Sequence, residues 1–557
     1  MKSIRGLCME LLISAVPKIM ESFQENTGRF IFGGENGGWG ITNQDVIYSL
    51  AVLYKDRGQR NIYRGDKKIL DMALLGGDCI RNFQYEDGRV EFLKADGSKW
   101  GPVYMPWTMY YWLETYDLLL TELGDRRAEE WRRGLILAMD GIKNELNRAS
   151  VHNITAWNGM SVYRAGQIFK REDYLRAGKE AIYRIVKGQD PRGFWPEHGG
   201  PTTHYNLVYI HAIGLYYYFS LDESVLESLK RSLDFQMCFT YPDGVPVETI
   251  DGRVKYSPNI SLMALPAFCL FPKGRRYARF LLEKSLERLG SSKWPPDVHS
   301  TPLIASAYMN TSSGEEESIL LESEKYVVNF DKMALVRRSG KWFYCLSAFT
   351  AKPTPNRWGM DRQNHFSLWH KDVGLIIGGG NSKNQPEFSN FIVSEDGKTI
   401  FIAESAEVKS SKNGDVLSLK YGETTCFIQP NIINDQEMEI DYAASSAKSF
   451  NRNISVRYNL ILRVQPGEIL RTAAGFEREL SEEKIELQNE EIGEWISNGN
   501  WFLYLPPDAN LLWPIKPFNP YRIDGSSPLK SAACIVWGEE AQISKRTFKV
   551  KVAGSRW

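Results

Sequence analysis

Two consecutive stretches decide the fold of the N-terminal half: MPWTMYYWLETYDLLLTELG (105–124) and RAEEWRRGLILAMDGIKNELN (127–147). Each repeats apolar residues at the three- and four-residue spacing of an amphipathic α-helix. Residues 125 and 126 alone separate them, and a connection this short makes consecutive helices pack as an antiparallel pair. The two stretches therefore predict a helical hairpin.

The same helical spacing recurs from about residue 5 to residue 310. It is clear in KKILDMALLGGDCIRNFQY (67–85), DYLRAGKEAIYRIVKGQ (173–189), SVLESLKRSLDFQMCF (224–239) and GRRYARFLLEKSLERLG (274–290). A weak repeat supports a stack of hairpins, because DGRVE (87–91), RGFWPE (192–197) and DGVPVE (243–248) each place a glutamate shortly after a glycine. Such units can form a ring of inner and outer helices, with ligand sites at one rim.

Near residue 310 the pattern changes to short β-branched and aromatic stretches. Examples are YVVNF, MALVRRSGKWFYCLSAF, FIVSEDGKTIFIAE, VKSSKNGDVLSLKY, ISVRYNLILRVQ, WFLYLP, CIVWG and TFKVKVA, and SGK, EDGK and NGD are typical of hairpin turns. The polar segment NTSSGEEES (310–318) is the predicted linker. We therefore expect an (α/α) toroid over residues 1–310 and an antiparallel β-sandwich over residues 311–557.

The composition excludes several classes of partner. Lysine plus arginine (68) equals aspartate plus glutamate (68) in the 557 residues, so no net charge favours a nucleic acid or an anionic membrane. No run approaches the ~20 apolar residues that a membrane span needs. The sequence gives no indication of oligomeric state. Seven scattered cysteines, mostly in apolar runs, predict buried thiols rather than disulfides or a cysteine-based zinc site.

The start of the chain, MKSIRGLCMELLISAVPKIMESF (1–23), has a basic tip and an apolar stretch. Glu10 interrupts the stretch and no clear small-residue cleavage site follows, so we interpret it as a first helix rather than a signal peptide. This favours a cytoplasmic location, or a periplasmic or secreted one if a signal has been removed.

Three of the seven histidines gather in FWPEHGGPTTHYNLVYIHAIGLYYYF (194–219), where a polar turn enters an aromatic helix. A purely structural interpretation is also open: His198 and His204 would donate hydrogen bonds within a loop, and His211 would pack in the core. Together they favour a functional site at the start of this helix.

A second candidate segment is VHNITAWNGMSVYRAGQIF (151–169), which places His152 and Asn153 just before a helix and therefore at the expected rim. Tyr205 follows His152 at nearly the spacing of the repeat, so both residues are expected to face one cavity. Helix capping is an equally good explanation for Asn153.

The third segment is NRWGMDRQNHFSLWHKDVGLIIGGGNSKNQPEF (356–388). Strand alternation places His365, Ser367 and Trp369 on one face of HFSLWH. The polar residues crowded before this strand indicate a functional site; they are Arg357, Asp361, Arg362, Gln363 and Asn364. The GGGN at 378–381 lacks the residues of a phosphate-binding loop.

No HExxH, paired CxxC or GxSxG occurs in the sequence. A nucleotide cofactor is not expected either. A metal held by scattered histidines and carboxylates stays open.

Long helical hairpins, an antiparallel sandwich and these three segments together resemble the heparinase II/III-like superfamily of polysaccharide lyases. The resemblance covers nearly the whole chain in architecture, through short motifs. VHNITAWNGMSVYRAGQIF looks like the family segment with an Asn or His before a helix rich in small residues. FWPEHGGPTTHYNLVYIHAIGLYYYF looks like the segment with a glutamate, a Tyr–His pair and an apolar helix.

The resemblance implies β-elimination on a uronic-acid glycan, with an acidic poly- or oligosaccharide as substrate. His152 or Asn153 would neutralise the substrate carboxylate, and Tyr205 would be the catalytic tyrosine. Asn206 stands where the family usually has a histidine.

DRQNHFSLWHKDVGLIIGGG (361–380) looks like the strand that carries a second catalytic histidine in an H-x-D-x-x-x-F pattern. Aligned on Phe366, the histidine position falls at Met360 and the aspartate position at Arg362, so the chain departs from the pattern. His365 or Arg362 would then act instead. The ligands of the usual structural metal in the sandwich are not evident.

Such a β-elimination requires a base that removes the proton α to the carboxylate, while hydrogen-bond donors or positive charge stabilise the enolate-like intermediate. Tyr205 is the expected base, and an ordinary phenol titrates near pH 10, so it needs a nearby cation. Tyr205, His204 or His365 would protonate the leaving oxygen. The expected substrate-binding residues are Trp39, Trp107, Trp157, Glu197, His198, Asn206, Arg357, Trp358 and Asn364, since aromatic faces stack on sugar rings.

Two other functions stay open. A glycoside hydrolase on the same toroid needs two carboxyl groups about 5 to 9.5 Å apart, and Asp45, Glu197, Glu248 and Asp361 are the candidates. Because the second catalytic histidine of the family pattern is displaced, a glycan-binding protein without catalytic activity is the other alternative.

Overall fold

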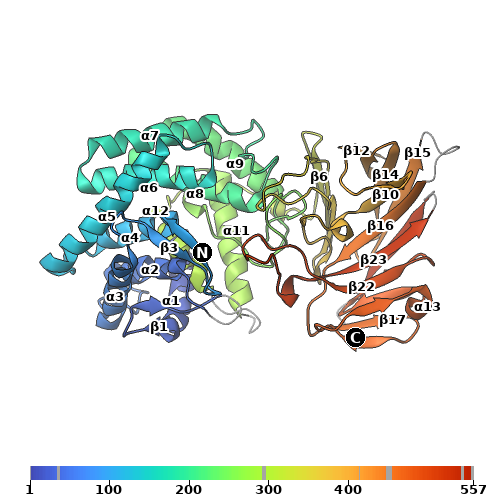
Figure 1. The fold of residues 1–557 in the computed structure, drawn as a ribbon, viewed down its shortest axis with the longest axis horizontal. Helices are drawn as coiled ribbons and strands as arrows, with labels where there is room; N and C mark the ends of the chain where they lie inside the picture. Colours follow the sequence, from blue (N-terminus) through green and yellow to red (C-terminus); the bar gives the residue numbers. More distant parts are fainter. Residues whose placement is uncertain are drawn as a thin grey trace. The chain divides into compact units, whose positions relative to one another are not determined.

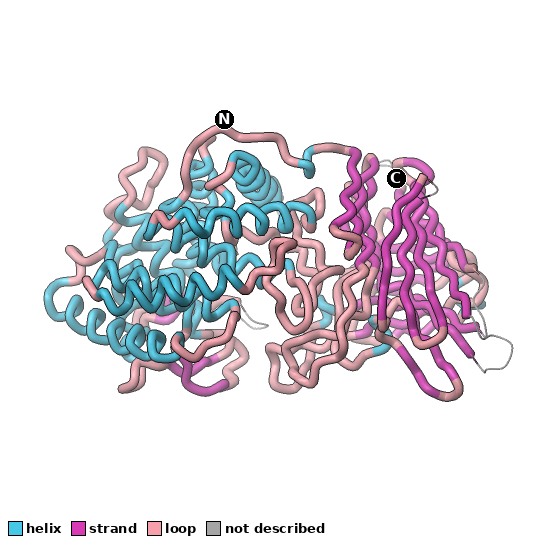
Figure 2. The backbone as a smooth tube through the Cα atoms, turned by 90° about the horizontal axis from the view of Figure 1, so that it is seen from above, coloured by secondary structure: helices cyan, strands magenta, loops and turns pink. Residues whose placement is uncertain are grey.

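The computed structural model describes residues 2–33, 38–290, 297–412, 414–446, 454–540 and 545–553. The chain divides into two compact units. Unit 1 comprises Met1–Phe194, Tyr205–Phe235 and Ile260–Ile319, and unit 2 comprises Trp195–His204, Gln236–Asn259 and Leu320–Trp557. Unit 2 thus takes two segments from the part of the chain before residue 310, where the sequence predicts one boundary. The long helices belong mainly to unit 1 and the long strands to unit 2; Figure 2 draws the helices in cyan and the strands in magenta.

The N-terminal part is built of helices separated by short connections (Figure 1). They are α1 (Ile4–Ser22), α2 (Val46–Lys55), α3 (Lys67–Phe83), α4 (Pro106–Leu118), α5 (Gly124–Leu146), α6 (Asn153–Phe169), α7 (Glu172–Lys187), α8 (Thr203–Ser220), α9 (Leu226–Cys238), α10 (Leu265–Phe268), α11 (Pro272–Gly290) and α12 (Thr301–Asn310). Two small hairpins interrupt them: β1 (Phe23–Gln24) with β2 (Arg29–Phe30), and β3 (Val90–Leu93) with β4 (Lys99–Val103). Each helical stretch quoted above forms a helix, as predicted.

Consecutive helices pack as antiparallel pairs, and α6 with α7 shows how. Gly159 lies against Ala181, whereas Gly166, further along α6, lies against Leu175, which is earlier in α7. A Cβ added to Gly178 would lie 2.6 Å from the carbonyl oxygen of Gly159. Glycine therefore permits the close approach of these two helices.

The even-numbered helices follow one another around a closed ring. Helix α12 packs on α2, α2 on α4, α4 on α6, and α10 on α12. The rings of Trp157 in α6 and His211 in α8 stack at 5.2 Å, and Gly214 of α8 lies against Ala267 of α10. These contacts close an inner layer, outside which helices such as α1, α3, α5 and α7 pack. The predicted toroid is confirmed.

The weak repeat of the sequence corresponds to one turn used three times. Gly88, Gly193 and Gly244 have φ of +87°, +96° and +91°, a conformation that suits glycine. The N–H of each donates to the carbonyl three residues earlier, at 2.8 to 3.0 Å. A Cβ on Gly193 would lie 2.2 Å from the carbonyl oxygen of Arg231. The repeat therefore reflects turn geometry as well as duplicated hairpins.

Unit 2 contains, among its described residues, two antiparallel sheets of eleven and nine strands. The first runs β19-β22-β23-β16-β9-β8-β7-β6-β5, with β10 beside β16 and β11 beside β10. Its strands are β5 (Lys325–Phe330), β6 (Ala334–Ser339), β7 (Trp342–Ser347), β8 (Phe366–His370), β9 (Gly374–Ile377), β10 (Phe391–Glu395), β11 (Lys398–Ile400), β16 (Ile454–Leu462), β19 (Ile485–Leu487), β22 (Asn510–Ile515) and β23 (Ala533–Glu540).

The second sheet runs β12-β13-β14-β15-β24-β21-β20-β17-β18. Its strands are β12 (Ser405–Ser411), β13 (Gly414–Tyr421), β14 (Thr424–Asn434), β15 (Glu437–Ser446), β17 (Ile469–Thr472), β18 (Glu477–Glu479), β20 (Trp495–Asn498), β21 (Trp501–Tyr504) and β24 (Arg546–Val552); the short helix α13 (Asn489–Ile492) precedes β20.

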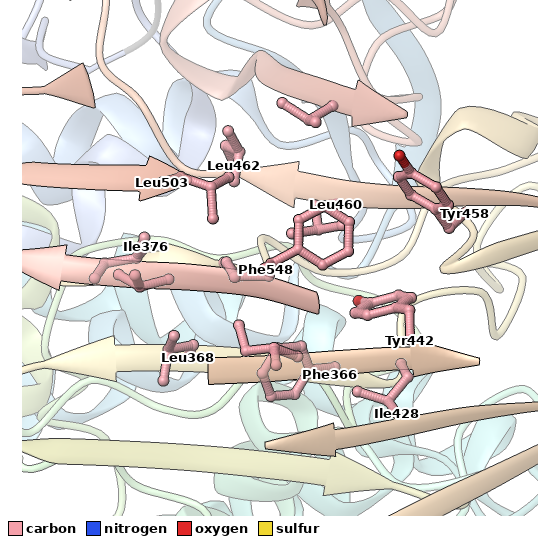
Figure 3. Packing of buried hydrophobic residues seen from close by; sticks show 14 of the residues in the cluster. Phe366, Leu368, Ile376, Ile428, Tyr442, Tyr458, Leu460, Leu462, Leu503 and Phe548 are labelled. Atoms are coloured by element: carbon pink, nitrogen blue, oxygen red, sulfur yellow. The ribbon is translucent and has the colours of Figure 1, made fainter. Parts of the chain in front are cut away.

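The two sheets share one apolar core. Phe366 and Leu368 of the first sheet pack in the same buried cluster as Ile428, Tyr442 and Phe548 of the second. Figure 3 shows side chains of both sheets meeting between the strands. Alternation along β8 places Phe366 and Leu368 in this core and turns Ser367 to the other face, as expected of a sandwich.

The strands quoted from the sequence all form, but the longest pair was not predicted. Strands β14 and β15 run through ETTCFIQPNIINDQEMEIDYAASS (423–446), where proline, asparagine and acidic residues dilute the β signal. Their buried positions nevertheless alternate, as in a half-buried strand. The SGK and EDGK turns join β6 to β7 and β10 to β11. The NGD turn begins at Asn413, which lies outside the described residues.

Residues 311–318 of the predicted linker contain no helix or strand, and its first residue, Asn310, is the last residue of α12. All seven cysteines are buried and free, as the sequence predicts. None of the described helices is both long and apolar enough to cross a membrane.

Candidate functional site

In unit 1, three of the predicted site residues lie at the starts of inner helices. Trp107 is in the first turn of α4, His152 immediately precedes α6, and Tyr205 is in the first turn of α8. All three are partly exposed. A 2.6 Å hydrogen bond from Thr108 of α4 to Asp45, just before α2, shows that the starts of α2 and α4 are adjacent. The inner helices therefore present their N-terminal ends at one rim of the ring.

The helix cap expected at Asn153 belongs to His152. The Nδ1 of His152 accepts from the N–H of Ile154 at 3.3 Å and so caps α6. Asn153 is the first residue of α6 and is buried, with its amide nitrogen 3.4 Å from the His152 Nε2. The pair therefore forms one polar unit at the rim.

Other predicted residues of unit 1 lie in its core. Trp157 packs among Trp107, Tyr110, Tyr111 and the His211 ring, and it is 1% exposed.

Trp39 and Asn206 are also buried, at 8% and 0% exposure. His211 accepts from the N–H of Ala264 at 3.1 Å, and burial lowers its pKa to about 3, so it is a neutral core residue. Trp39, Trp157 and Asn206 therefore present little surface for a sugar to contact.

In unit 2, Trp358 lies beside two guanidinium groups. The guanidinium carbon of Arg253 is 5.6 Å from the centre of the Trp358 ring, and that of Arg357 is 5.8 Å away. Trp358 is partly exposed and packs against Tyr521 at 5.5 Å. An aromatic face beside fixed positive charge suits the apolar face and the acidic group of a uronic acid. We call Arg253, Arg357 and Trp358 the Arg–Trp cluster.

The Arg–Trp cluster is held by buried polar neighbours. Glu197 is 3% exposed, and its Oε2 accepts from the Arg253 Nη1 at 3.3 Å. His198 lies beside it, with its Nε2 3.9 Å from the Glu197 carboxylate and its Nδ1 2.9 Å from the Asn356 amide. The predicted residues Glu197, His198, Arg357 and Trp358 are therefore neighbours in unit 2.

Asp251 holds the loop that carries Arg253. Its carboxylate accepts from the N–H groups of Arg253 and Val254 at 2.7 and 2.8 Å, and from the His204 N–H at 3.1 Å. The carbonyl of Asp251 accepts from the Asn381 amide at 2.9 Å. The side chain of His204 is exposed. Asp251 thus links the segments that surround Arg253.

Arg362 is a buried brace between two loops. It is 3% exposed, and it donates to the carbonyl oxygens of Pro201, at 2.8 Å, and Ile250. A Cβ on Gly200 or Gly252 would lie within 2.6 Å of its Nη2, so both glycines leave room for the guanidinium group. Burial lowers the pKa of Arg362 to about 10. These contacts give Arg362 a structural role, and a role in catalysis stays a prediction.

His365 and Asn364 lie inside unit 2 at 1% and 2% exposure. The His365 Nδ1 is 2.9 Å from the Ser347 carbonyl, and burial lowers the pKa of His365 to about 4. His365 is therefore neutral at pH 7, with Nδ1 protonated to donate that bond. Its part in proton transfer stays a prediction.

A buried acid that the sequence assigns only to the hydrolase alternative lies nearby in unit 2. Glu248 accepts from the Tyr241 hydroxyl at 2.9 Å and from the Gly379 N–H at 3.0 Å. The Ser367 hydroxyl is 2.9 Å from that of Tyr241 and accepts from Thr249 at 2.6 Å. Burial raises the pKa of Glu248 to about 7. The GGG segment (378–380) therefore contacts a carboxyl group rather than a phosphate.

The other candidate carboxylates also have protein partners. Asp45 accepts from Thr108, and burial raises its pKa well above the ordinary value. Asp361 accepts from the Asn384 N–H at 2.7 Å and lies 3.8 Å from the Lys383 Nζ. Glu91, the repeat glutamate of the first turn, accepts from the Gly101 N–H at 2.7 Å. Each of these three carboxylates therefore helps to hold the local structure around it.

Within the described ranges, no three His, Cys, Asp or Glu side chains gather closely enough to hold a metal ion. The sequence reasoning missed Arg253, Tyr241 and Asp251. All three lie in the stretch TYPDGVPVETIDGR (240–253), whose DG pairs indicate turns, and a second turn carrying an arginine is the signal that was available.

Compared by sequence, the chain matches no protein-family model and no curated protein. Compared by structure, it is similar to a chondroitin AC lyase of Streptomyces coelicolor A3, with a TM-score of 0.51 and 13% identity over 99% of this chain and 80% of that one. A heparinase III has a TM-score of 0.47 and 12% identity, covering 92% of this chain and 77% of its own. A chondroitin lyase that is a baculovirus envelope protein has a TM-score of 0.45 and 12% identity, covering 92% of this chain and 76% of its own.

The likeness to the chondroitin AC lyase extends over nearly the whole chain and shows the fold. Both parts of the predicted architecture, the ring of helical hairpins and the antiparallel sheets, are present in the order expected. The chain therefore has the fold of this chondroitin AC lyase, which confirms, at the level of the fold, the resemblance to polysaccharide lyases seen in the sequence.

Proposed function

We propose that this protein is a polysaccharide lyase that cleaves a uronic-acid-containing glycan by β-elimination. The observation that carries the proposal is the Arg–Trp cluster, in which a partly exposed indole has two guanidinium groups within 6 Å of its ring. The indole offers a platform for a sugar ring, and the guanidinium groups match a carboxylate. The lyase fold supports the same substrate class.

In the proposed reaction, a base removes the proton from the sugar carbon next to the carboxylate. The electron pair forms a carbon–carbon double bond as the bond to the glycosidic oxygen breaks, and that oxygen leaves with a proton. Tyr205 is the proposed base because it is a partly exposed phenol at the rim of unit 1. His152 and Asn153 are the proposed donors to the carboxylate, which becomes more basic as the enolate-like intermediate forms.

The roles of the other predicted residues are narrower. His204 is exposed and adjacent to Tyr205 in sequence, so it is the proposed alternative acid for the leaving oxygen. Glu197 and His198 are proposed to orient the Arg–Trp cluster rather than to contact the reacting atoms. Trp107 is the proposed sugar platform of unit 1.

The test is an incubation of the purified protein with a panel of uronic-acid polysaccharides, sulfated and unsulfated. A lyase produces ultraviolet absorbance from the new conjugated double bond together with new reducing ends. Reducing ends without absorbance would assign the protein to the glycoside hydrolases. Glycan binding with neither product would assign it to the binding proteins.

A further inference from the structure

A pocket in unit 1 lies apart from every residue assigned above. Its volume is about 460 Å³, within the range of small-molecule sites. It lies where the start of α1, the first half of α11 and the segment after α12 meet. The side chains that matter for its chemistry are Arg5, Arg275, Arg279, Thr311, Ser312 and Glu316.

The pocket carries a net positive charge, since three guanidinium groups face one carboxylate. Arg279 and Glu316 neutralise each other: the Arg279 Nε and Nη2 donate to that carboxylate at 2.8 and 2.6 Å. The Arg279 Nη1 donates to the Lys2 carbonyl at 2.5 Å. Arg5 and Arg275 have no carboxylate partner among the described residues. Two positive charges therefore remain for a ligand.

Arg275 is held by two hydrogen bonds that leave one of its terminal nitrogens available to a ligand. Its Nε donates to the Glu315 carbonyl at 2.7 Å and its Nη1 to the Cys269 carbonyl at 2.9 Å. Its Nη2 donates no hydrogen bond within the described part of the chain. Arg5 makes one long contact, 3.5 Å from its Nη2 to the Met309 carbonyl. N–H donors that the protein orients, but to which it supplies no acceptor, are suited to bind an anion.

Thr311 adds a neutral donor to the pocket. It is 7% exposed, it lines the pocket, and its hydroxyl has no hydrogen-bond partner among the described residues. The hydroxyl oxygen itself is accessible from the pocket, so it can donate to a ligand there. The neighbouring Ser312, by contrast, donates to the Cys269 carbonyl at 2.6 Å.

We propose that this pocket binds a sulfate or phosphate group through Arg5, Arg275 and Thr311. Its donors come from three separate elements and so surround the ligand, which suits a tetrahedral oxyanion better than a planar carboxylate. A dianion matches the two uncompensated guanidinium groups. The group is either a free ion or a substituent on a sugar, and its binding joins the segment 311–316 to α1 and α11.

The test is equilibrium dialysis of the full-length protein against radiolabelled sulfate and phosphate at low ionic strength. We expect saturable binding that falls at least about tenfold in Arg275→Gln and in Arg5→Gln, because a hydrogen bond to a charged group contributes more than one tenfold step. Thr311→Val is expected to weaken binding less. Arg126→Gln, which removes an exposed arginine of α5, is the matched control and should bind as the wild type does.

A parallel titration with glucose 6-sulfate separates the two sources. Tighter binding than sulfate assigns the pocket to a sugar-borne group, and equal binding assigns it to the free ion. The proposal is wrong if no saturable binding occurs, if the double variant Arg5→Gln/Arg275→Gln binds as well as the wild type, or if glucuronate binds more tightly than both. Arg5→Lys and Arg275→Lys keep the charge and serve where a glutamine variant fails to fold. The proposal does not depend on lyase activity.

Discussion

Arg253 and Glu197 form a buried contact in unit 2, with 3.3 Å between the Nη1 of the arginine and an oxygen of the carboxylate. The same guanidinium lies 5.6 Å from the centre of the Trp358 ring, so the glutamate holds the arginine beside an aromatic face. Neither partner is near the other in sequence. This relationship is the basis of the first prediction.

Removing the Arg–Trp cluster should weaken binding of the acidic glycan. We expect Arg253→Gln and Trp358→Ala each to raise KM at least about tenfold, because a charged hydrogen bond or a stacking face is lost. KM and kcat are measured by absorbance of the unsaturated product. Trp537→Ala is the matched control, since Arg457 lies 4.0 Å from the ring of that tryptophan elsewhere in unit 2. An equal effect of Trp537→Ala would count against a specific role for Trp358.

Tyr205→Phe removes the proposed base while keeping the ring. We expect loss of turnover to background with unchanged thermal stability and nearly unchanged glycan binding, because Tyr205 is partly exposed and the substitution deletes one hydroxyl. Turnover is followed by absorbance and binding by calorimetry. Tyr183→Phe, which deletes the hydroxyl of an exposed tyrosine in α7, is the control. Normal turnover in Tyr205→Phe would exclude Tyr205 from the mechanism.

Glu248 should make the stability of unit 2 depend on pH. Burial raises its pKa from 4.5 to about 7, so the folded state holds a proton that the unfolded state has released. The stabilisation is complete below about pH 4.5 and is lost as the pH rises through about 7.

Glu248→Gln mimics the protonated acid and should lack this dependence. We therefore expect the free energy of unfolding of the wild type, relative to the variant, to fall by about 3 kcal/mol between pH 4.5 and 7. Urea unfolding at several pH values measures it. A constant difference between the two proteins across that range would show that Glu248 does not titrate there.

Gly193→Ala should destabilise unit 1 by more than the backbone conformation alone explains. The positive φ costs about 1 to 2 kcal/mol for a residue with a Cβ, and the new Cβ would lie 2.2 Å from the Arg231 carbonyl oxygen. Gly97→Ala is the control, since Gly97 has φ of +82° and nothing within 4 Å of the added atom. Chemical denaturation compares the two. Equal losses would mean that the packing around Gly193 relaxes.

The sequence alone determined the two kinds of architecture in this chain. Helical spacing of apolar residues and period-two alternation are local properties, so they identify α4 and α5 as clearly as β5 to β7. The glycine of each repeat turn is also local, because φ near +90° excludes most other residues. Strands β14 and β15 were not predicted because proline and acidic residues obscure their apolar alternation in the sequence. The alternation appears only in which residues are buried in the sandwich.

Only the tertiary structure decided which polar residues are available for chemistry. The sequence treats Trp107 and Trp157 alike, yet the first is partly exposed and the second is buried against it. The sequence makes Arg362 a candidate catalytic group, but its guanidinium donates to two carbonyl oxygens of loops distant in sequence. Arg253 gains its place beside Trp358 through Glu197 and Asp251. Exposure and long-range hydrogen bonds depend on residues far apart in the chain, so no local pattern encodes them.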